Sequence, residues 1–182
     1  MTQLYFVTSN SNKFVEVQAI LPDIKQLIAD VPEIQSLDPR RIIEQKLAEV
    51  LRGREGGFIV EDTSLSLHCL NGLPGPLIKW FLEALGTAGI ARLAVTLGDL
   101  AAEARTMIGY AKNPQEVYFF EGVLHGSIVE PRGETTFGWD PIFVPEGHAK
   151  TFAEMSQDEK NTLSMRRKAV EQLRQFLAQE AG

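Results

Sequence analysis

Cysteine, basic charge and long apolar runs are all scarce in this sequence of 182 residues. The single cysteine, Cys69, excludes an intramolecular disulfide and a multi-cysteine metal cluster, and we expect it to be a small buried residue in a reducing compartment. No apolar run approaches the length that crosses a bilayer, and residues 1–13 lack the layout of a secretory signal. We therefore expect a cytoplasmic protein with no membrane partner.

The formal net charge of -6 leaves little room for a broad basic surface. Nucleic-acid binding relies on such a surface, so we expect no nucleic-acid partner. A phosphate-bearing ligand would have to be held by local cations, although each cation taken alone is more often a solvated surface charge. The candidates are Lys13, Lys46, Lys79, Lys160, Arg166, Arg167 and Lys168.

Strand and helix patterns alternate in the first half of the chain. Residues 4–7 form a short apolar run, and apolar residues then recur at helical spacing from Phe14 to Leu21. Asp38 and Pro39 mark the start of a second helix, which is expected to end at Gly53. This alternation is typical of an α/β fold.

The second half of the chain continues the alternation. Gly86 divides two expected helices at 78–85 and 90–97, and residues 106–129 predict a long antiparallel pair of strands with a turn at 112–114. A capping box at Ser156 and Glu159 predicts a terminal helix that runs toward Gln179. We expect an α/β class with a mixed sheet, in one domain over residues 1–182.

A polar segment follows the first strand, where a helix begins. Free backbone N–H groups and the helix dipole suit an anion there, and Lys13 would add a full charge. The glycines and the Gly-Lys-Ser/Thr ending of a Walker loop are missing. Taken alone, an ordinary helix cap is the favoured interpretation. The segment consists of Thr8, Ser9, Asn10, Ser11, Asn12 and Lys13.

The acid pair Glu61 and Asp62 interrupts two strand-like segments. Carboxylates at the edge of a core are costly unless they bind a cation or pair with a base. Magnesium prefers one or two carboxylates together with phosphate oxygens and waters, and Glu33 offers a second carboxylate. An ion pair in a loop explains Glu61 and Asp62 equally well when they are considered alone.

The turn at 137–140 and the start of the terminal helix carry further candidates. Aromatic rings in the turn could stack on a nucleobase, and Asp140 could accept a hydrogen bond from it; a rigid aromatic turn in the core is the alternative. Lys160 and Arg166 could project from one helix toward one region, with a solvated basic face as the alternative.

Five motifs, in this order along the chain, together resemble the inosine triphosphate pyrophosphatase family. They are TSNSNK at 8–13, VEDTSL at 60–65, GLPGPLIKWF at 72–81, FGWDPIF at 137–143, and TFAEM with EKN at 151–155 and 159–161. Their wording is closest to the eukaryotic-type enzymes. The resemblance implies hydrolysis of non-canonical purine nucleoside triphosphates (ITP, dITP and XTP) to the monophosphate and pyrophosphate, which cleanses the nucleotide pool.

The resemblance also implies a structure and a set of site residues. The structure is a long curved mixed sheet with helices in two lobes around a nucleotide cleft, in a homodimer. Glu33 and Asp62 would hold Mg²⁺, for which Mn²⁺ can substitute, and Asp62 with Glu61 would orient or deprotonate the attacking water. The implied substrate contacts are Thr8, Ser9, Asn10, Ser11, Asn12, Lys13, Lys46, Asp62, Thr63, Lys79, Phe137, Gly138, Trp139, Asp140, Lys160, Met165 and Arg166.

One position departs from the family pattern. The family's Ser-His-Arg stands here as Ser164, Met165 and Arg166, and the arginine is tied in the family to the keto oxygen at purine position 6. A thioether cannot donate a hydrogen bond, so the same reaction with altered base preference is the nearest alternative. A nucleotide-binding protein without catalysis is a second alternative, against which the intact acids and lysines argue.

Overall fold

The computed structural model describes residues 3–134 and 138–180. Within these residues a seven-stranded sheet has the order β2-β1-β3-β5-β6-β7, with β4 paired to β3. β1 is parallel to β2 and β3, whereas β4 is antiparallel to β3 and β7 to β6. The expected α/β class with a mixed sheet is therefore confirmed.

The described chain divides into two compact units. Unit 1 consists of residues 3–62, 106–122 and 165–180, and unit 2 of residues 63–105, 123–134 and 138–164. Three strands have residues in both units: β3 (Gly57–Leu67), β5 (Ala101–Asn113) and β6 (Glu116–Ile128). Each unit is described separately below.

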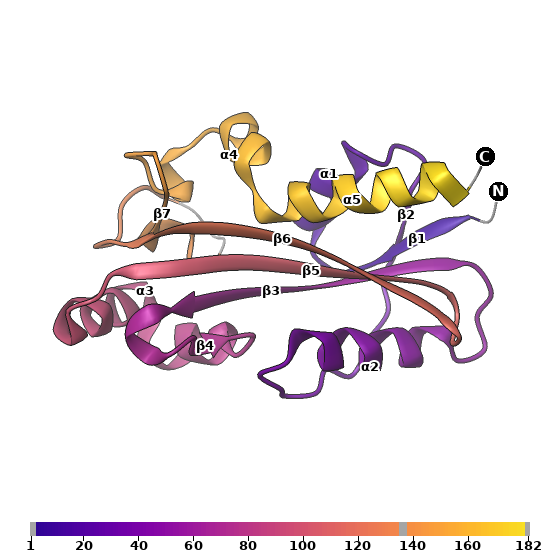
Figure 1. Ribbon diagram of the computed structural model, residues 1–182, viewed down its shortest axis with the longest axis horizontal. Helices are drawn as coiled ribbons and strands as arrows, with labels where there is room; N and C mark the ends of the chain where they lie inside the picture. Colours follow the sequence, from indigo (N-terminus) through magenta and orange to yellow (C-terminus); the bar gives the residue numbers. More distant parts are fainter. Residues whose placement is uncertain (1–2, 135–137, 181–182) are drawn as a thin grey trace. The chain divides into compact units, whose positions relative to one another are not determined.

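Unit 1 is a sheet with helices on both faces. Figure 1 shows α1 and α5 on one side of its strands and α2 on the other. Its remaining strands, β1 and β2, are short, with four and three residues. The elements are β1 (Leu4–Val7), α1 (Ser11–Gln18), β2 (Lys25–Leu27), α2 (Pro39–Leu51) and α5 (Met165–Glu180).

The residues of β3 in unit 1 alternate between two apolar clusters. Ile59 packs with residues of α1 and α5, whereas Phe58 and Val60 pack with residues of α2. This is the period of two expected for a strand that is covered on both faces. The alternation places Glu61 on the face of α1 and α5 and Asp62 on the face of α2, so the two acids meet different helices.

Gly122 allows the start of α5 to lie against β6. A Cβ at this position would stand 1.8 Å from the carbonyl oxygen of Met165, a distance that only a backbone shift could relieve. Glycine is therefore required here by a close backbone approach rather than by a turn. The approach fixes the first residues of α5, including Arg166, against the sheet of unit 1.

Unit 2 contains one long helix and several short elements. The helix is α3 (Ile78–Leu97), and a second helix, α4 (Gln157–Leu163), begins at a capping box of Ser156 and Glu159, as the sequence predicts. Its short elements are β4 (Pro74–Gly75), β7 (Phe143–Pro145) and the 3-10 turns η1 (His68–Leu70), η2 (Asp140–Ile142) and η3 (Phe152–Glu154).

The long helix α3 is interrupted at the predicted glycine. Gly86 has φ 65° and ψ 175°, which is not helical, so the two halves meet at a kink. By length and composition alone α3 could cross a membrane, with a mean hydropathy of 1.3. The kink at Gly86 divides it into halves that are each too short to span a bilayer on their own.

Cys69, expected to be a buried residue in a strand, is instead partly exposed in the 3-10 turn η1. Two further predictions about secondary structure were wrong. Glu61 and Asp62 do not interrupt two strands, because β3 continues through them without a break.

The predicted single terminal helix is two helices, α4 and α5, with Ser164 between them in an extended conformation. The sequence predicts that Lys160 and Arg166 project from one helix, and this is wrong. The two residues lie on different helices and belong to different units.

Candidate active site

A buried network of charges surrounds Glu61 in unit 1. The guanidinium of Arg166 donates from Nε to Glu61 Oε2 at 2.8 Å and from Nη2 to Glu61 Oε1 at 3.1 Å. The ammonium of Lys13 forms an ion pair with Oε1 at 2.7 Å. The remaining arm of Arg166, Nη1, donates to Glu16 Oε2 at 2.7 Å. Two helices, α1 and α5, are thus joined to β3 by one set of charges.

This network keeps Glu61 ionised. Burial on its own would raise the pKa of Glu61, but Arg166 and Lys13 outweigh it and hold the pKa well below its usual range. Burial likewise opposes the charge on Arg166, and the carboxylates of Glu61 and Glu16 more than compensate and raise its pKa. A carboxylate with so low a pKa is a poor proton acceptor, so the geometry favours a positioning role for Glu61.

Asp62 lies next to Glu61 in sequence but in a different environment. Lys46 of α2 approaches it, with 3.9 Å between Nζ and Asp62 Oδ1, and the same nitrogen lies 2.8 Å from Glu33 Oε1. Burial raises the pKa of Asp62 to about 6; Lys46 lowers it and Glu33 raises it. Neighbouring acids on one strand therefore have pKa values shifted in opposite directions, a pattern typical of catalytic sites.

One oxygen of Asp62 is left without a protein partner. Among the residues that the structure describes, Oδ2 of this buried carboxylate has no hydrogen-bond partner. Such an atom is costly unless a ligand satisfies it. Glu33 and Asp62, both facing Lys46, fit a divalent cation that completes its shell with phosphate oxygens and waters. No group of three or more His, Cys, Asp or Glu in the described ranges could hold a metal by itself.

The polar segment before α1 is organised as a helix cap. Asn10 is the N-cap and its side chain accepts a hydrogen bond from the N–H of Lys13 at 3.1 Å, while Thr8 Oγ1 accepts from the N–H of Asn10 at 3.1 Å. Ser11 and Asn12 are exposed in the first turn. The cap interpretation holds for Asn10, and it also orients Lys13 toward Glu61.

The sequence profile of the Ham1 family matches residues 4–176. The chain belongs to the Ham1 family. It is similar to the inosine triphosphate pyrophosphatase of Schizosaccharomyces pombe, with 40% identity over 99% of this chain and 97% of that protein. It is also similar to the inosine triphosphate pyrophosphatase of Ajellomyces capsulatus, with 43% identity over 98% of each protein.

Solved structures of Ham1 proteins have the same fold. A HAM1 protein from Coxiella burnetii matches with a TM-score of 0.86 and 27% identity, over 98% of this chain and 100% of its own. A dITP/XTP pyrophosphatase from Mycobacterium abscessus matches with a TM-score of 0.73 and 26% identity, over 94% and 98%. Ham1 enzymes are metal-dependent hydrolases of non-canonical nucleoside triphosphates. The family predicted from the five motifs is therefore confirmed, and so is the predicted reaction class, hydrolysis of non-canonical nucleoside triphosphates.

Several of the predicted site residues lie in unit 2 and contact one another there. Lys160 of α4 forms a buried ion pair with Asp140 and lies 5.3 Å from the centroid of the Phe152 ring. Trp139 is 3% exposed and packs edge-on against Phe143, with ring centroids 5.5 Å apart. Trp139 is thus part of the core of unit 2, as in the alternative interpretation, and stacking of a base on Trp139 remains a prediction.

Three other predicted positions lie elsewhere or outside the described residues. Lys79 is exposed on α3, with its Nζ 3.9 Å from Glu83 Oε1. The same nitrogen lies 5.4 Å from the centroid of the Trp80 ring. Gly138 has φ 44°, a conformation that favours glycine in this turn. Phe137 lies outside the described residues.

Met165 is buried at the start of α5. The residue is only 1% exposed, and its backbone carbonyl lies close to Gly122 of β6. The structure therefore offers no observation that favours a base contact for this methionine, and a packing role is sufficient to explain it. Arg166 next to it is also 1% exposed, and it donates hydrogen bonds to the carboxylates of Glu61 and Glu16 in unit 1.

Sequence reasoning missed Glu16. This acid lies on α1, three residues after Lys13, and its carboxylate accepts a hydrogen bond from Arg166 although 150 positions separate the two. The available signal was an acid on the apolar face of the first helix, between Phe14 and Val17, where a charge is expensive unless it has a partner. That signal could have predicted a buried pair but not the identity of the partner.

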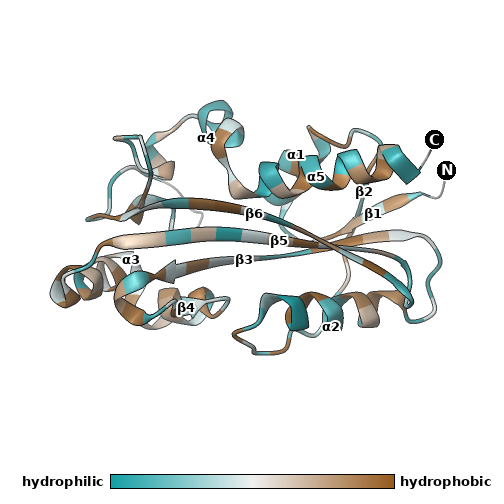
Figure 2. Ribbon diagram, in the orientation of Figure 1, coloured by the Kyte–Doolittle hydropathy of each residue, from teal (hydrophilic) through white to brown (hydrophobic). Residues whose placement is uncertain are grey.

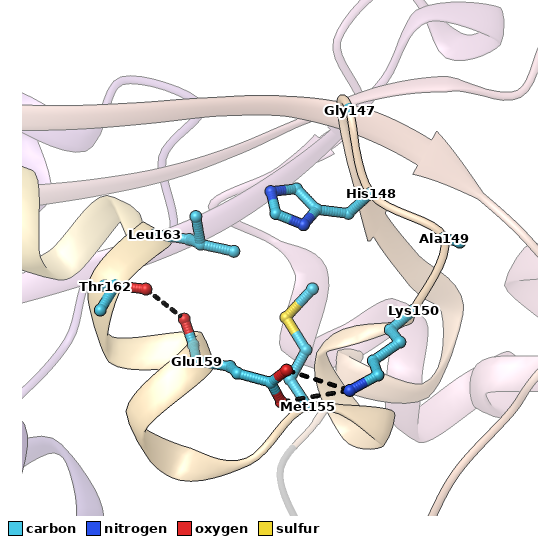
Figure 3. Close-up of a pocket in the computed structure, with 8 residues that line it drawn as sticks. All are labelled: Gly147, His148, Ala149, Lys150, Met155, Glu159, Thr162 and Leu163. Carbon is cyan, nitrogen blue, oxygen red and sulfur yellow. Dashed lines mark hydrogen bonds and ion pairs between the residues drawn. The ribbon is translucent and has the colours of Figure 1, made fainter.

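A pocket of about 350 Å³ is lined by residues of unit 2 alone. Figure 3 shows these residues. The imidazole of His148 points between Leu163 and Met155, and Lys150 bonds to Glu159 at its rim. No predicted site residue in the described part of the chain lines this pocket. We assign no role in catalysis to it, because its charged residues are exposed and already paired with each other.

Proposed function

We propose that this Ham1 protein hydrolyses inosine and xanthosine triphosphates to the monophosphate and pyrophosphate. The observation that carries the proposal is the pair of adjacent acids on β3, one paired by Arg166 and Lys13 and the other left with an unpartnered oxygen beside Lys46 and Glu33. The choice of inosine nucleotides is supported by the similar inosine triphosphate pyrophosphatases, and that of xanthosine nucleotides by the similar dITP/XTP pyrophosphatase.

In this proposal the metal is Mg²⁺ or Mn²⁺, held by Glu33 and Asp62. Bound there, the ion would neutralise charge on the triphosphate. Lys13 and Lys46 bind phosphate oxygens, and Glu61 holds Lys13 in place at 2.7 Å. Asp62 orients a water for in-line attack on the α-phosphorus. A bond forms between the water oxygen and the α-phosphorus as the bond to the bridging oxygen breaks; Asp62 takes a proton from the water, and pyrophosphate leaves with the bonding electron pair.

The remaining predicted contacts are part of the same proposal. On α1 and the segment before it, the free N–H groups of the first turn suit an anion, although the side chain of Asn10 is used as a cap. The residues proposed to contact substrate, beyond those already named, are Thr8, Ser9, Asn10, Ser11, Asn12, Thr63, Lys79, Phe137, Gly138, Trp139, Asp140, Lys160 and Arg166. The expected contact from Met165 is not part of this proposal, because Met165 is only 1% exposed.

We also propose a homodimer in the cytoplasm. The support within unit 2 is the surface of α3, where Trp80, Leu85, Val95 and Leu97 are each about half exposed. Exposed apolar residues of this size on one helix are typical of a protein interface. Sedimentation equilibrium should give twice the chain mass of 20.2 kDa, and V95D should reduce it to the monomer mass. An unchanged mass in V95D would place the interface elsewhere.

The reaction is tested by product analysis. The protein is incubated with ITP, XTP, GTP or ATP in Mg²⁺, and phosphorus NMR identifies what is released. The proposal expects pyrophosphate, formed faster from ITP and XTP than from ATP. Release of orthophosphate would overturn the reaction, and equal rates on all four nucleotides would overturn the substrate class.

A further inference from the structure

Lys46 lies where the two proposed metal ligands converge. Its ammonium is 2.8 Å from Glu33 Oε1 and 3.9 Å from Asp62 Oδ1, and it donates a hydrogen bond to the backbone oxygen of Glu61 at 3.1 Å. The Lys46 side chain is 15% exposed, that of Glu33 50% and that of Asp62 7%, so water screens the contact with Glu33 more than the contact with Asp62. The nitrogen thus has three oxygen neighbours, two of which carry the charges assigned to the metal.

An ammonium in this position and a divalent cation would use the same carboxylates. A metal ion binds carboxylate oxygens directly at short distance, and a second positive charge held between the same oxygens repels it. Both cations can be accommodated only if the lysine moves. Because a lysine has a long flexible stem, its ammonium group can move from these carboxylates to a nearby phosphate.

We propose that Lys46 is an internal counter-ion that holds the Glu33 and Asp62 pair until a triphosphate draws it away. The inference rests on the proposed function, because the phosphates are the anions that take Lys46. It has a thermodynamic consequence: nucleotide binding releases the carboxylates for the metal, and metal binding releases Lys46 for the nucleotide. Each ligand then raises the affinity for the other by the same factor.

The other lysine of unit 1 at this site has a different role. Lys13 forms its ion pair with Glu61, a carboxylate that Arg166 also neutralises, rather than with either of the proposed metal ligands. Removal of Lys13 would take away a positive charge that acts on Asp62 from a distance. It would not free the space between Glu33 and Asp62, which Lys46 occupies. The two lysines therefore provide a matched comparison between long-range charge and direct displacement.

The test measures binding of Mn²⁺ alone, without nucleotide. Electron paramagnetic resonance of free Mn²⁺ gives its Kd for the wild-type protein, K46M, K46Q, K46R and K13M, each first checked by circular dichroism for a wild-type fold. We expect K46M and K46Q to bind Mn²⁺ about tenfold or more tightly, which corresponds to about 1.4 kcal/mol. K13M should change the Kd less than about threefold, and K46R, which keeps the charge, should stay near wild type.

The outcomes separate this inference from the proposed function. Unchanged or weaker Mn²⁺ binding in both K46M and K46Q overturns it, as does an equal gain in K13M, which would mean a general field effect. If the wild-type protein releases pyrophosphate from ITP while K46M and K46Q bind Mn²⁺ like wild type, the inference fails and the function stands. If the wild type releases no pyrophosphate, the proposed function fails whatever the Mn²⁺ result.

Discussion

Arg166 and Glu61 form a two-pronged ion pair across 105 positions of sequence, with both residues almost fully buried. The pair links the first turn of α5 to the middle of β3. Because Glu16 takes the third guanidinium nitrogen, the arginine serves two carboxylates at once. The position of the acids on β3 therefore depends on the end of the chain, although the acids themselves lie in its first half.

Replacing Arg166 should destabilise the protein strongly. R166M keeps the volume of the side chain but leaves Glu61 and Glu16 buried without their partner, and breaking such a pair costs about 3–5 kcal/mol. Urea denaturation of R166M and of R174M, whose arginine is on the exposed side of α5, measures the difference. A loss of less than about 1 kcal/mol in R166M would contradict this account of the network.

The contact between Gly122 and α5 can be tested with one methyl group. G122A would bring a Cβ to 1.8 Å from the oxygen of Met165, so we expect a loss of about 1–3 kcal/mol or more and a lower kcat as Arg166 shifts. G57A is the matched control, because its Cβ would first meet side-chain atoms at 3.3 Å. Equal stability of the two variants in thermal melts would show that the close approach is not a constraint.

The charge of Asp62 should make stability depend on pH. Burial raises the pKa of Asp62 to about 6 from 3.8, so the folded state favours the protonated form. The contribution of the protonated Asp62 to the unfolding free energy is therefore complete below about pH 4 and is lost as the pH rises through about 6. In metal-free buffer, D62N should gain about 1–3 kcal/mol relative to wild type between pH 4 and 7.5. A difference in unfolding free energy that does not vary with pH would contradict the shift.

Position 165 can be tested directly. Because Met165 is 1% exposed, we expect M165H to lose about 1–3 kcal/mol of stability, since an imidazole would be buried in its place. We expect the ratio of kcat/KM for ITP to that for ATP to stay within about threefold of wild type. A change of tenfold or more in that ratio would show that the residue at 165 does contact the base.

Local sequence signals predicted much of unit 1. The cap at Asp38 and Pro39 places α2 correctly, and the side chain of Asp38 accepts a hydrogen bond from the N–H of Arg40 at 2.9 Å. Figure 2 shows the alternation of teal and brown along α5 that a helix with one buried face requires. The break at Gly86 was also predictable, because glycine adopts positive φ without strain.

The misses have physical causes that are not local. Glu61 and Asp62 look like a break in a strand, but partners on α1, α2 and α5 allow two charges to remain in a continuous strand. The capping box at Ser156 predicts a helix start and says nothing of its end, so the break at Ser164 was missed. The sequence also could not identify the partner of Glu16, because that partner, Arg166, lies 150 positions away.

The central claim is that Asp62 belongs to the centre that releases pyrophosphate. Phosphorus NMR of ITP hydrolysis in Mg²⁺ compares wild type, D62N and D23N, the last a control at an exposed aspartate in the loop before β2. We predict pyrophosphate release by wild type and D23N, and a loss of at least about a hundredfold in kcat for D62N with its fold intact. Pyrophosphate release by D62N at a rate near that of wild type would contradict the claim.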